Sequence, residues 1–378
     1  MIYKLYISVF VCALYLISFN TICAQQSQTV ALSDHATRLA DLRTEIEKII
    51  KFDTEIDYKK TPGFIVGVLD NNQRYFVSFG YKNKEKTSII AVNDVFEIGS
   101  LSKSMTSDII HALVDEGKLN YNSQINQYLP EIYRNPRLSE VTILDLLNHQ
   151  SSLPKLPKGF GKKEKYTQNP YANFTTLDLL IYYRDYIPEN FTFRYSHINY
   201  ALLELIIEHT TEDSYEDALS AYLLDKLNLE DTFVDLKEQK QMVTVPGHDR
   251  SRKQVGPWIF ASFKGSEGIK SSINDLLLYT QFHLNEKLKD PIHDEWNENE
   301  SKRSFNAKLY QNLGWHFVMM GSNLVTINTG FTSGHTAFIG RIDHLNKAVV
   351  VLSNSSVGVG DLGLQILRMI TNGNLKNN

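Results

Sequence analysis

The chain has 378 residues, and its 39 basic and 43 acidic side chains give a formal net charge of −4. At roughly 100–200 residues per domain, this length allows two domains or one large domain with an insertion. No basic block stands out, which argues against nucleic acid and anionic membrane surfaces as partners. The hydrophobic content of 42% is ordinary for a globular protein with a buried core.

The first 24 residues have the pattern of a signal peptide. Lys4 supplies the charged start, residues 5–19 are apolar, and Ile22-Cys23-Ala24 suits a cleavage site. The apolar stretch is shorter than the roughly 20 residues that a membrane-spanning helix needs, which favours a cleaved signal peptide. The alternative is an uncleaved membrane anchor. We therefore expect a periplasmic or secreted protein with no membrane contact beyond export. Both cysteines, Cys12 and Cys23, lie in this segment, so the mature chain would use no disulfide, thiol nucleophile or zinc–thiolate site.

The patterning of the remaining chain predicts strands towards both ends and helices between them. Leucines and isoleucines at helical spacing predict a helix over residues 34–52. A turn of Asp70-Asn71-Asn72 between two apolar runs predicts a β-hairpin of residues 63–69 and 75–80. Further helices are expected at 102–116, 177–183, 200–209 and 361–371, and further strands at 314–320, 323–328, 336–343 and 347–352.

This order of elements predicts an α/β (α+β) fold. An antiparallel sheet built from the two ends of the chain would be flanked by helices and would carry an inserted helical domain. We expect residues 25–105 and 260–378 to form the sheet domain, and residues 106–259 to form the mainly helical domain.

The first sign of chemistry is Ser100-Leu101-Ser102-Lys103, an S-x-x-K tetrapeptide at the predicted start of a helix. Positions i and i+3 share a helix face with Cβ atoms about 5–6 Å apart, so the Lys103 amine can reach the Ser100 hydroxyl. A serine nucleophile needs a nearby base, and a desolvated lysine can lose its proton near neutral pH. The tetrapeptide alone is weak, because it recurs at Ser152-Leu153-Pro154-Lys155, where the proline disfavours a helical turn.

Further motifs stand in order along the chain. They are Thr61-Pro62-Gly63 at a strand start, Phe96 to Lys103, G-K-L to Y-L-P-E over residues 117–131, an L-L-N-H-Q-S-S-L-P segment over residues 146–154, Tyr195-Ser196-His197, Glu267 to Ser272 with Asp275, and Asn328-Thr329-Gly330. Together they resemble the penicillin-binding protein and class C β-lactamase family of serine hydrolases, in which the sixth motif reads G-G-L-x-S-T … D. The resemblance covers roughly residues 60–370. It implies that family's β-lactamase/transpeptidase-like fold, with the site between a sheet domain and a helical domain.

The resemblance also implies roles for individual residues. Ser100 would be the nucleophile and Lys103 its partner. Tyr195 would share the proton transfers, with its pKa lowered from a reference value near 10 by the lysine ammonium. The backbone N–H groups of Ser100 and Phe331 would form the oxyanion hole, and Gly330 would lie against the substrate. No cofactor and no metal are expected.

Two positions depart from the β-lactamase pattern, and both bear on the substrate. His197 replaces the asparagine of the tyrosine motif, an amide that can both donate and accept. Asn328 replaces the lysine of the strand motif, so a cation that would hold a substrate carboxylate is lost. His335 is expected to line the same cleft as a substitute, with a packing role as the alternative. His149 is expected to pack rather than to serve as a triad base.

We therefore predict a serine hydrolase that forms an acyl-enzyme with an ester or amide bond of a small-molecule or peptide substrate. The esterase or D-amino-acid peptidase type fits the two departures best. A β-lactamase is one alternative. A non-catalytic protein that binds cell-wall peptides is the other, in which His197 and Asn328 would be signs of decay.

Overall fold

The computed structural model describes residues 35–51, 56, 61–161, 169–190, 192–234, 244–285, 297–299 and 309–373. The predicted signal peptide, residues 1–24, lies outside this part of the chain. Within the described residues, no helix has both the length and the apolar character needed to cross a membrane.

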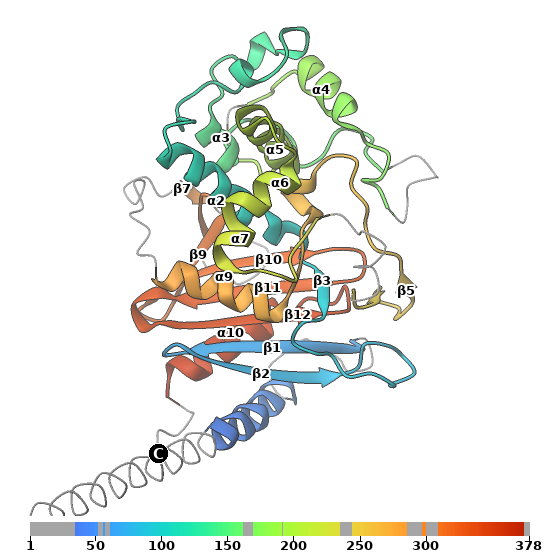
Figure 1. Ribbon diagram of the computed structural model, residues 1–378, viewed down its shortest axis with the longest axis vertical. Coiled ribbons are helices and arrows are strands. Elements are labelled where there is room, and N and C mark those ends of the chain that lie inside the picture. The colour runs from blue at the N-terminus through green and yellow to red at the C-terminus, as the bar shows by residue number, and fades with distance from the viewer. Residues whose placement is uncertain are drawn as a thin grey trace, which may run out of the picture.

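An eight-stranded antiparallel sheet runs across the middle of Figure 1 and joins the two ends of the chain. Its strand order is β2-β1-β12-β11-β10-β9-β8-β7, so the N-terminal hairpin pairs with the last strand. At this junction Phe64 lies opposite Ser353, and Asp70 lies opposite Lys347. The bounds are β1 Gly63–Asp70, β2 Gln73–Gly80, β7 Asn297–Asn299, β8 Leu309–Asn312, β9 Trp315–Met320, β10 Asn323–Phe331, β11 Thr336–Ile342 and β12 Lys347–Ser353.

The hairpin and the four C-terminal strands confirm the predicted strands. The turn between β1 and β2 places Asn71 and Asn72 at φ 50° and 67°, in the left-handed region that asparagine tolerates. Strands β11 and β12 are separate, because a 3-10 turn, Asp343–Leu345, and Asn346 at φ 51° reverse the chain between them.

Helices cover both faces of the sheet. On one face, the helix of residues 35–51 and α10 (Gly360–Thr371) pack against apolar strand residues. These two helices confirm the helices predicted at residues 34–52 and 361–371. On the other face, α9 (Ile273–Asn285) packs against β1 and β12. Gly67 permits this close approach, because a Cβ there would lie 2.8 Å from the Leu277 side chain.

The remaining helices lie above the sheet in Figure 1 and are inserted between two short paired strands, β3 (Val95–Glu97) and β6 (Lys270–Ser272). A π-helical turn, Lys264–Gly268, leads the chain back into β6. The helices predicted at residues 102–116, 177–183 and 200–209 correspond to α2, α4 and α5. The bounds of the two domains stay a prediction. The inserted helices are α2 Ser102–Asp115, α3 Ile143–Leu147, α4 Thr176–Asp185, α5 His197–Thr211, α6 Tyr215–Leu219 and α7 Asp225–Leu227.

Candidate active site

Ser100 lies where strand β3 passes into helix α2. Residues Gly99–Leu101 form a 3-10 turn that continues into α2, so the Ser100 hydroxyl stands at a helix N-terminus. Free N–H groups and the helix dipole there favour developing negative charge. Gly99 has φ 52°, and a Cβ at this position would lie 2.7 Å from the backbone nitrogen of Phe331. Ser100 is partly exposed to solvent.

Strand β10 passes directly beside this turn. A Cβ at Gly330 would lie 1.7 Å from the carbonyl oxygen of Ile98, so the strand can approach this closely only with glycine. The N–H of Thr332 donates to the His335 carbonyl at 2.9 Å across the β10–β11 hairpin. Because N–H groups alternate in direction along an antiparallel strand, the N–H of Phe331 points away from β11. The Phe331 backbone nitrogen thus lies beside the turn that carries Ser100, and its role in an oxyanion hole stays a prediction.

Lys103 lies one turn further along α2, on the same face as Ser100. Its Nζ is 3.4 Å from the Ser100 Oγ and 2.9 Å from the carbonyl oxygen of Ser266. The rings of Tyr195 and Tyr200 lie 5.4 and 5.7 Å from Nζ, and only 2% of Lys103 is exposed. Burial lowers the pKa of Lys103, while the neighbouring Glu267 carboxylate acts to raise it.

A carboxylate that the sequence reasoning missed lies at the centre of the site. Glu267 Oε1 accepts hydrogen bonds from the Ser100 Oγ at 2.6 Å, from Lys103 Nζ at 2.8 Å and from His197 Nδ1. Burial acts to raise the pKa of Glu267, but Lys103 and His197 outweigh it and hold the pKa well below its ordinary value. Glu267 is therefore ionised at neutral pH. The sequence did carry a signal, because Glu267 stands where the family pattern has its first glycine.

His197 is the first residue of α5, and its ring contacts the Glu267 carboxylate. Its Nδ1 lies against Glu267 and is 3.3 Å from both Lys103 Nζ and Ser266 Oγ. Burial lowers the pKa of His197 to about 4, so the ring is neutral near pH 7. A neutral ring has one N–H, and Glu267 fixes it on Nδ1 because a carboxylate only accepts.

Tyr195 lies beside Lys103, and Ser100 acts to lower the pKa of its phenol. Its ring packs on His149, with centroids 4.5 Å apart. The prediction that a lysine ammonium lowers the pKa of Tyr195 is wrong, because burial and the Glu267 carboxylate raise this pKa above its ordinary value. In this setting Tyr195 can donate a proton or a hydrogen bond as a neutral phenol, and it is not a phenolate base.

Asn328 and His335, two predicted substrate contacts, form hydrogen bonds within the protein. The Asn328 amide donates to the Gly314 carbonyl at 3.0 Å and accepts from the next backbone N–H at 2.8 Å. The His335 Nδ1 lies 3.2 Å from the Glu97 carboxylate, and its Nε2 lies 2.9 Å from a backbone carbonyl. Both side chains are only 2% exposed. The structure thus places His335 in a buried network, and Asn328 beside the site without a free polar group.

Two further candidates behave as the sequence suggested. His149 is fully buried, and its Nδ1 accepts the Ser196 N–H at 3.1 Å, which is a packing role. Ser152 of the second S-x-x-K has φ 70°, so no helical turn brings its hydroxyl to a lysine. Among the described residues, no group of three or more His, Cys, Asp or Glu side chains could hold a metal ion.

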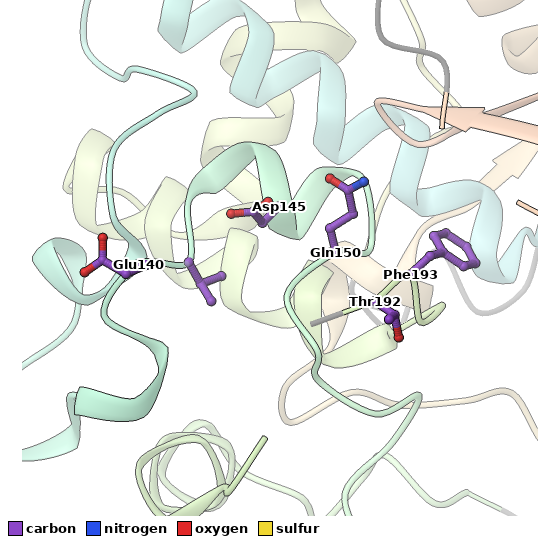
Figure 2. Close-up of a pocket in the computed structure, with 6 residues that line it drawn as sticks. Glu140, Asp145, Gln150, Thr192 and Phe193 are labelled. Atoms are coloured by element: carbon purple, nitrogen blue, oxygen red, sulfur yellow. The ribbon is translucent and has the colours of Figure 1, made fainter. Parts of the chain in front are cut away.

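A separate hollow lies beside α3 and involves none of these residues. In Figure 2, Glu140 lies at one end of it, and Thr192 and Phe193 lie at the other. The Asp145 carboxylate caps α3, because it accepts from the Thr142 N–H at 2.9 Å and from its hydroxyl at 2.7 Å. The hollow is lined by Glu140, Val141, Asp145, Gln150, Thr192 and Phe193.

Comparison with known proteins gives consistent matches. The family model described as Beta-lactamase matches residues 51–369. A β-lactamase of Pseudomonas fluorescens is 24% identical over 278 residues, covering 72% of this chain and 74% of the relative. Protein flp of Staphylococcus aureus (strain N315) is 26% identical over 333 residues, covering 84% of this chain and 64% of the relative.

Solved structures match over most of the chain. A class C β-lactamase gives a TM-score of 0.74 at 21% identity and covers 91% of this chain and 98% of that chain. The β-lactamase/D-alanine carboxypeptidase from Pseudomonas syringae gives a TM-score of 0.72 at 19% identity, with 88% and 99% covered. These likenesses confirm the predicted fold class.

Proposed function

The chain belongs to the β-lactamase family of serine hydrolases, and from this premise we propose that it hydrolyses ester or amide bonds whose recognition needs no free carboxylate beside strand β10. The esterase and D-amino-acid peptidase types meet this condition. The reaction proceeds in two steps through an acyl-enzyme on Ser100, followed by attack of water.

The observation that carries this proposal is the state of Asn328. The residue is neutral, buried and hydrogen-bonded on both sides of its amide. A charge-assisted pair to a carboxylate is roughly twice as strong as a neutral hydrogen bond, so a lysine at this position would favour carboxylate-bearing substrates. His335 does not replace that cation, because its ring nitrogens contact Glu97 and a backbone carbonyl.

A β-lactamase is the second candidate. The relative from Pseudomonas fluorescens and the class C structure are both named as β-lactamases. The acyl-enzyme chemistry is the same, so the two candidates differ only in what the cleft binds.

The decisive experiment compares three substrate classes on the exported, purified chain: p-nitrophenyl esters, D-amino-acid amides and a chromogenic cephalosporin. Ser100→Ala is expected to abolish turnover of each substrate that the parent hydrolyses. Ser152→Ala is the matched control, since that serine heads the second S-x-x-K in a backbone conformation that is not helical, and parental rates are expected. Equal activity of Ser100→Ala and the parent would assign the wrong nucleophile. A kcat/KM that is highest for the cephalosporin would select the β-lactamase.

The same preparation tests the non-catalytic alternative and export. A fluorophosphonate probe is expected to label Ser100 covalently, whereas absence of both labelling and turnover would make this a binding protein. N-terminal sequencing of the exported protein is expected to begin at Gln25, after the proposed signal peptide. A sequence that begins before Lys4 would indicate an uncleaved anchor.

A further inference from the structure

We propose that Glu267 is the general base of this site, and that Lys103 is the cation that holds it in place. In this assignment the proton of Ser100 passes to a carboxylate and not to the lysine amine. It rests on the proposed function, because it concerns the same nucleophile.

The hydrogen bonds of Ser100 give the direction of proton transfer. The hydroxyl donates to Glu267 Oε1 at 2.6 Å, a short bond of the kind that a carboxylate forms with a hydroxyl. Lys103 Nζ lies 3.4 Å from the same Oγ, which is a long contact. A catalytic base lies within about 2.6–3.2 Å of the proton-bearing atom, and of the carboxylate and the amine the carboxylate is the one inside this range.

The two acceptors that contact Lys103 oppose the loss of its proton, whereas burial lowers its pKa. Its Nζ donates to the Glu267 carboxylate at 2.8 Å and to the Ser266 carbonyl at 2.9 Å, and both partners are pure acceptors. An ammonium group only donates, so it cannot take a proton from Ser100. Lys103 would have to lose a proton, and with it a buried ion pair, before it could act as the base.

Glu267 is held rigidly enough to serve in catalysis. It belongs to the π-helical turn Lys264–Gly268, which is tied to both neighbouring helices. The Gly265 N–H donates to Glu204 of α5 at 3.0 Å, and the Gly265 carbonyl accepts from Thr106 of α2 at 2.6 Å. His197 adds a third donor to the carboxylate itself. Such second contacts fix the orientation that proton transfer requires.

The base acts in both halves of the reaction. In acylation, the Ser100 Oγ bonds to the substrate carbonyl carbon as its proton moves to Glu267. The resulting oxyanion accepts from the N–H groups of Ser100 and Phe331. Glu267 then gives the proton to the leaving oxygen or nitrogen as that bond breaks. In deacylation, Glu267 takes a proton from water, whose oxygen bonds to the carbonyl carbon. The Ser100 Oγ then leaves and regains the proton, and the acid is released.

The test uses two substitutions of the base and one matched control, with p-nitrophenyl acetate as substrate. Glu267→Gln is expected to lower kcat/KM by about 10²–10⁴, the range of general base catalysis. Glu267→Ala leaves room for a small carboxylate, so added formate is expected to restore part of its activity, whereas formate does nothing for the glutamine variant. Asp145→Asn is the control, because this carboxylate accepts from the backbone N–H and the hydroxyl of Thr142 at the start of α3, and a rate close to that of the parent is expected.

A pH profile separates a base from a structural residue. Besides Ser100, the groups that face Glu267 are Lys103 of α2, His197 of α5, and Tyr195 and Tyr171 from loops. With Glu267 as the base, kcat/KM stays level from pH 7 down to about 5, because an ionised carboxylate of ordinary pKa near 4.3 or lower is already deprotonated there. With a lysine base that is protonated at pH 7, kcat/KM falls continuously as the pH decreases through this range.

Each result decides the assignment. Parental or higher activity of Glu267→Gln would overturn it, and a higher rate would show that the carboxylate locks Ser100 in an unreactive state. If the glutamine variant does not fold, formate rescue of the alanine variant and the parental pH profile still decide, and a continuous fall of the profile overturns the assignment. If the parent turns over no substrate, the proposed function fails. If the parent is active, Ser100→Ala is inactive and Glu267→Gln is parental, only the assignment of the base fails.

Discussion

Replacing Glu97 by glutamine is expected to cost about 3–5 kcal/mol of unfolding free energy, the usual effect of removing one partner of a buried ion pair. Glu97 ends strand β3, and only 3% of it is exposed. Its Oε2 accepts from the Thr332 hydroxyl at 2.7 Å and faces the His335 Nδ1 at 3.2 Å, while its Oε1 accepts the Trp258 N–H. A glutamine has only one acceptor oxygen, so its NH₂ group would face a ring nitrogen that now donates.

The loss has a defined pH dependence. Burial acts to raise the pKa of Glu97, but the hydrogen bond and charge of His335, the charge of Lys270 and the hydrogen bond of Thr332 together outweigh it, so the pKa is lower than its ordinary value. The stability from this depressed pKa is present above about pH 4.3, the ordinary value of a glutamate, and is lost as the pH falls through the folded value. The difference between parent and Glu97→Gln is therefore expected to shrink between pH 7 and pH 3.

Chemical unfolding in guanidinium chloride at several pH values measures this difference. Asp185→Asn is the control, because Asp185 pairs with Arg184 at 2.7 Å on the exposed surface, where an ion pair contributes little. A loss below 1 kcal/mol for Glu97→Gln, or a loss that is the same at pH 7 and pH 3, would refute the reasoning. Esterase activity is expected to fall as well, because Glu97 ties the strand before Ser100 to the hairpin that carries Phe331.

Three further substitutions test the site and its support. Gly330→Ala places a Cβ 1.7 Å from the Ile98 carbonyl oxygen, so β10 must shift. In steady-state kinetics, kcat is expected to drop by about 10²–10³, as for the loss of an oxyanion donor. A parental kcat would contradict this. Burial raises the pKa of Glu204 to about 8, so the parent loses stability as the pH rises from about 4.3 towards 8. Glu204→Gln is therefore expected to gain stability relative to the parent over that range, as measured by urea unfolding. A stability difference that does not change with pH would contradict this. Asn328→Lys is expected to restore a charge-assisted contact to a substrate carboxylate. Its ratio of kcat/KM for the cephalosporin to kcat/KM for the ester should therefore be about 10-fold higher than that of Asn328→Met, the uncharged control. Equal ratios in the two variants would contradict this.

Much of the fold follows from local patterns. The Asn71-Asn72 turn sets the N-terminal hairpin, and helical spacing of leucines and isoleucines sets the helices at both ends. Strand β1 is buried along its whole length, which is why its sequence reads as an almost unbroken apolar run. The two C-terminal strands could be separated because the residues at 343–346 carry turn chemistry. None of these features depends on residues far away in the sequence.

The site was predicted only as far as its residues are close in sequence or share the family's motifs. Ser100 and Lys103 share one helical turn, so their spacing gives their geometry. Glu267 comes from a π-helical turn that has no periodic signature, and its place beside Ser100 depends on how distant elements pack. The predicted direction of the Tyr195 pKa shift was wrong because burial, together with the unforeseen Glu267 carboxylate, raises this pKa. The sequence left a cleft role and a packing role open for His335, and could not choose between them because its partner, Glu97, lies in a distant strand.

Two departures from the family's pattern contact each other, and this bears on whether the site is active. His197 stands where an asparagine is usual and Glu267 where a glycine is usual, and the ring N–H of the first donates to the carboxylate of the second. A buried carboxylate without donors costs several kcal/mol, so a decaying site would lose such a group or neutralise it. Here the carboxylate has three donors, remains ionised, and lies 2.6 Å from the Ser100 hydroxyl. A negative charge directed at the nucleophile is what the proposed proton transfer needs, so this contact favours the catalytic proposal over the non-catalytic alternative.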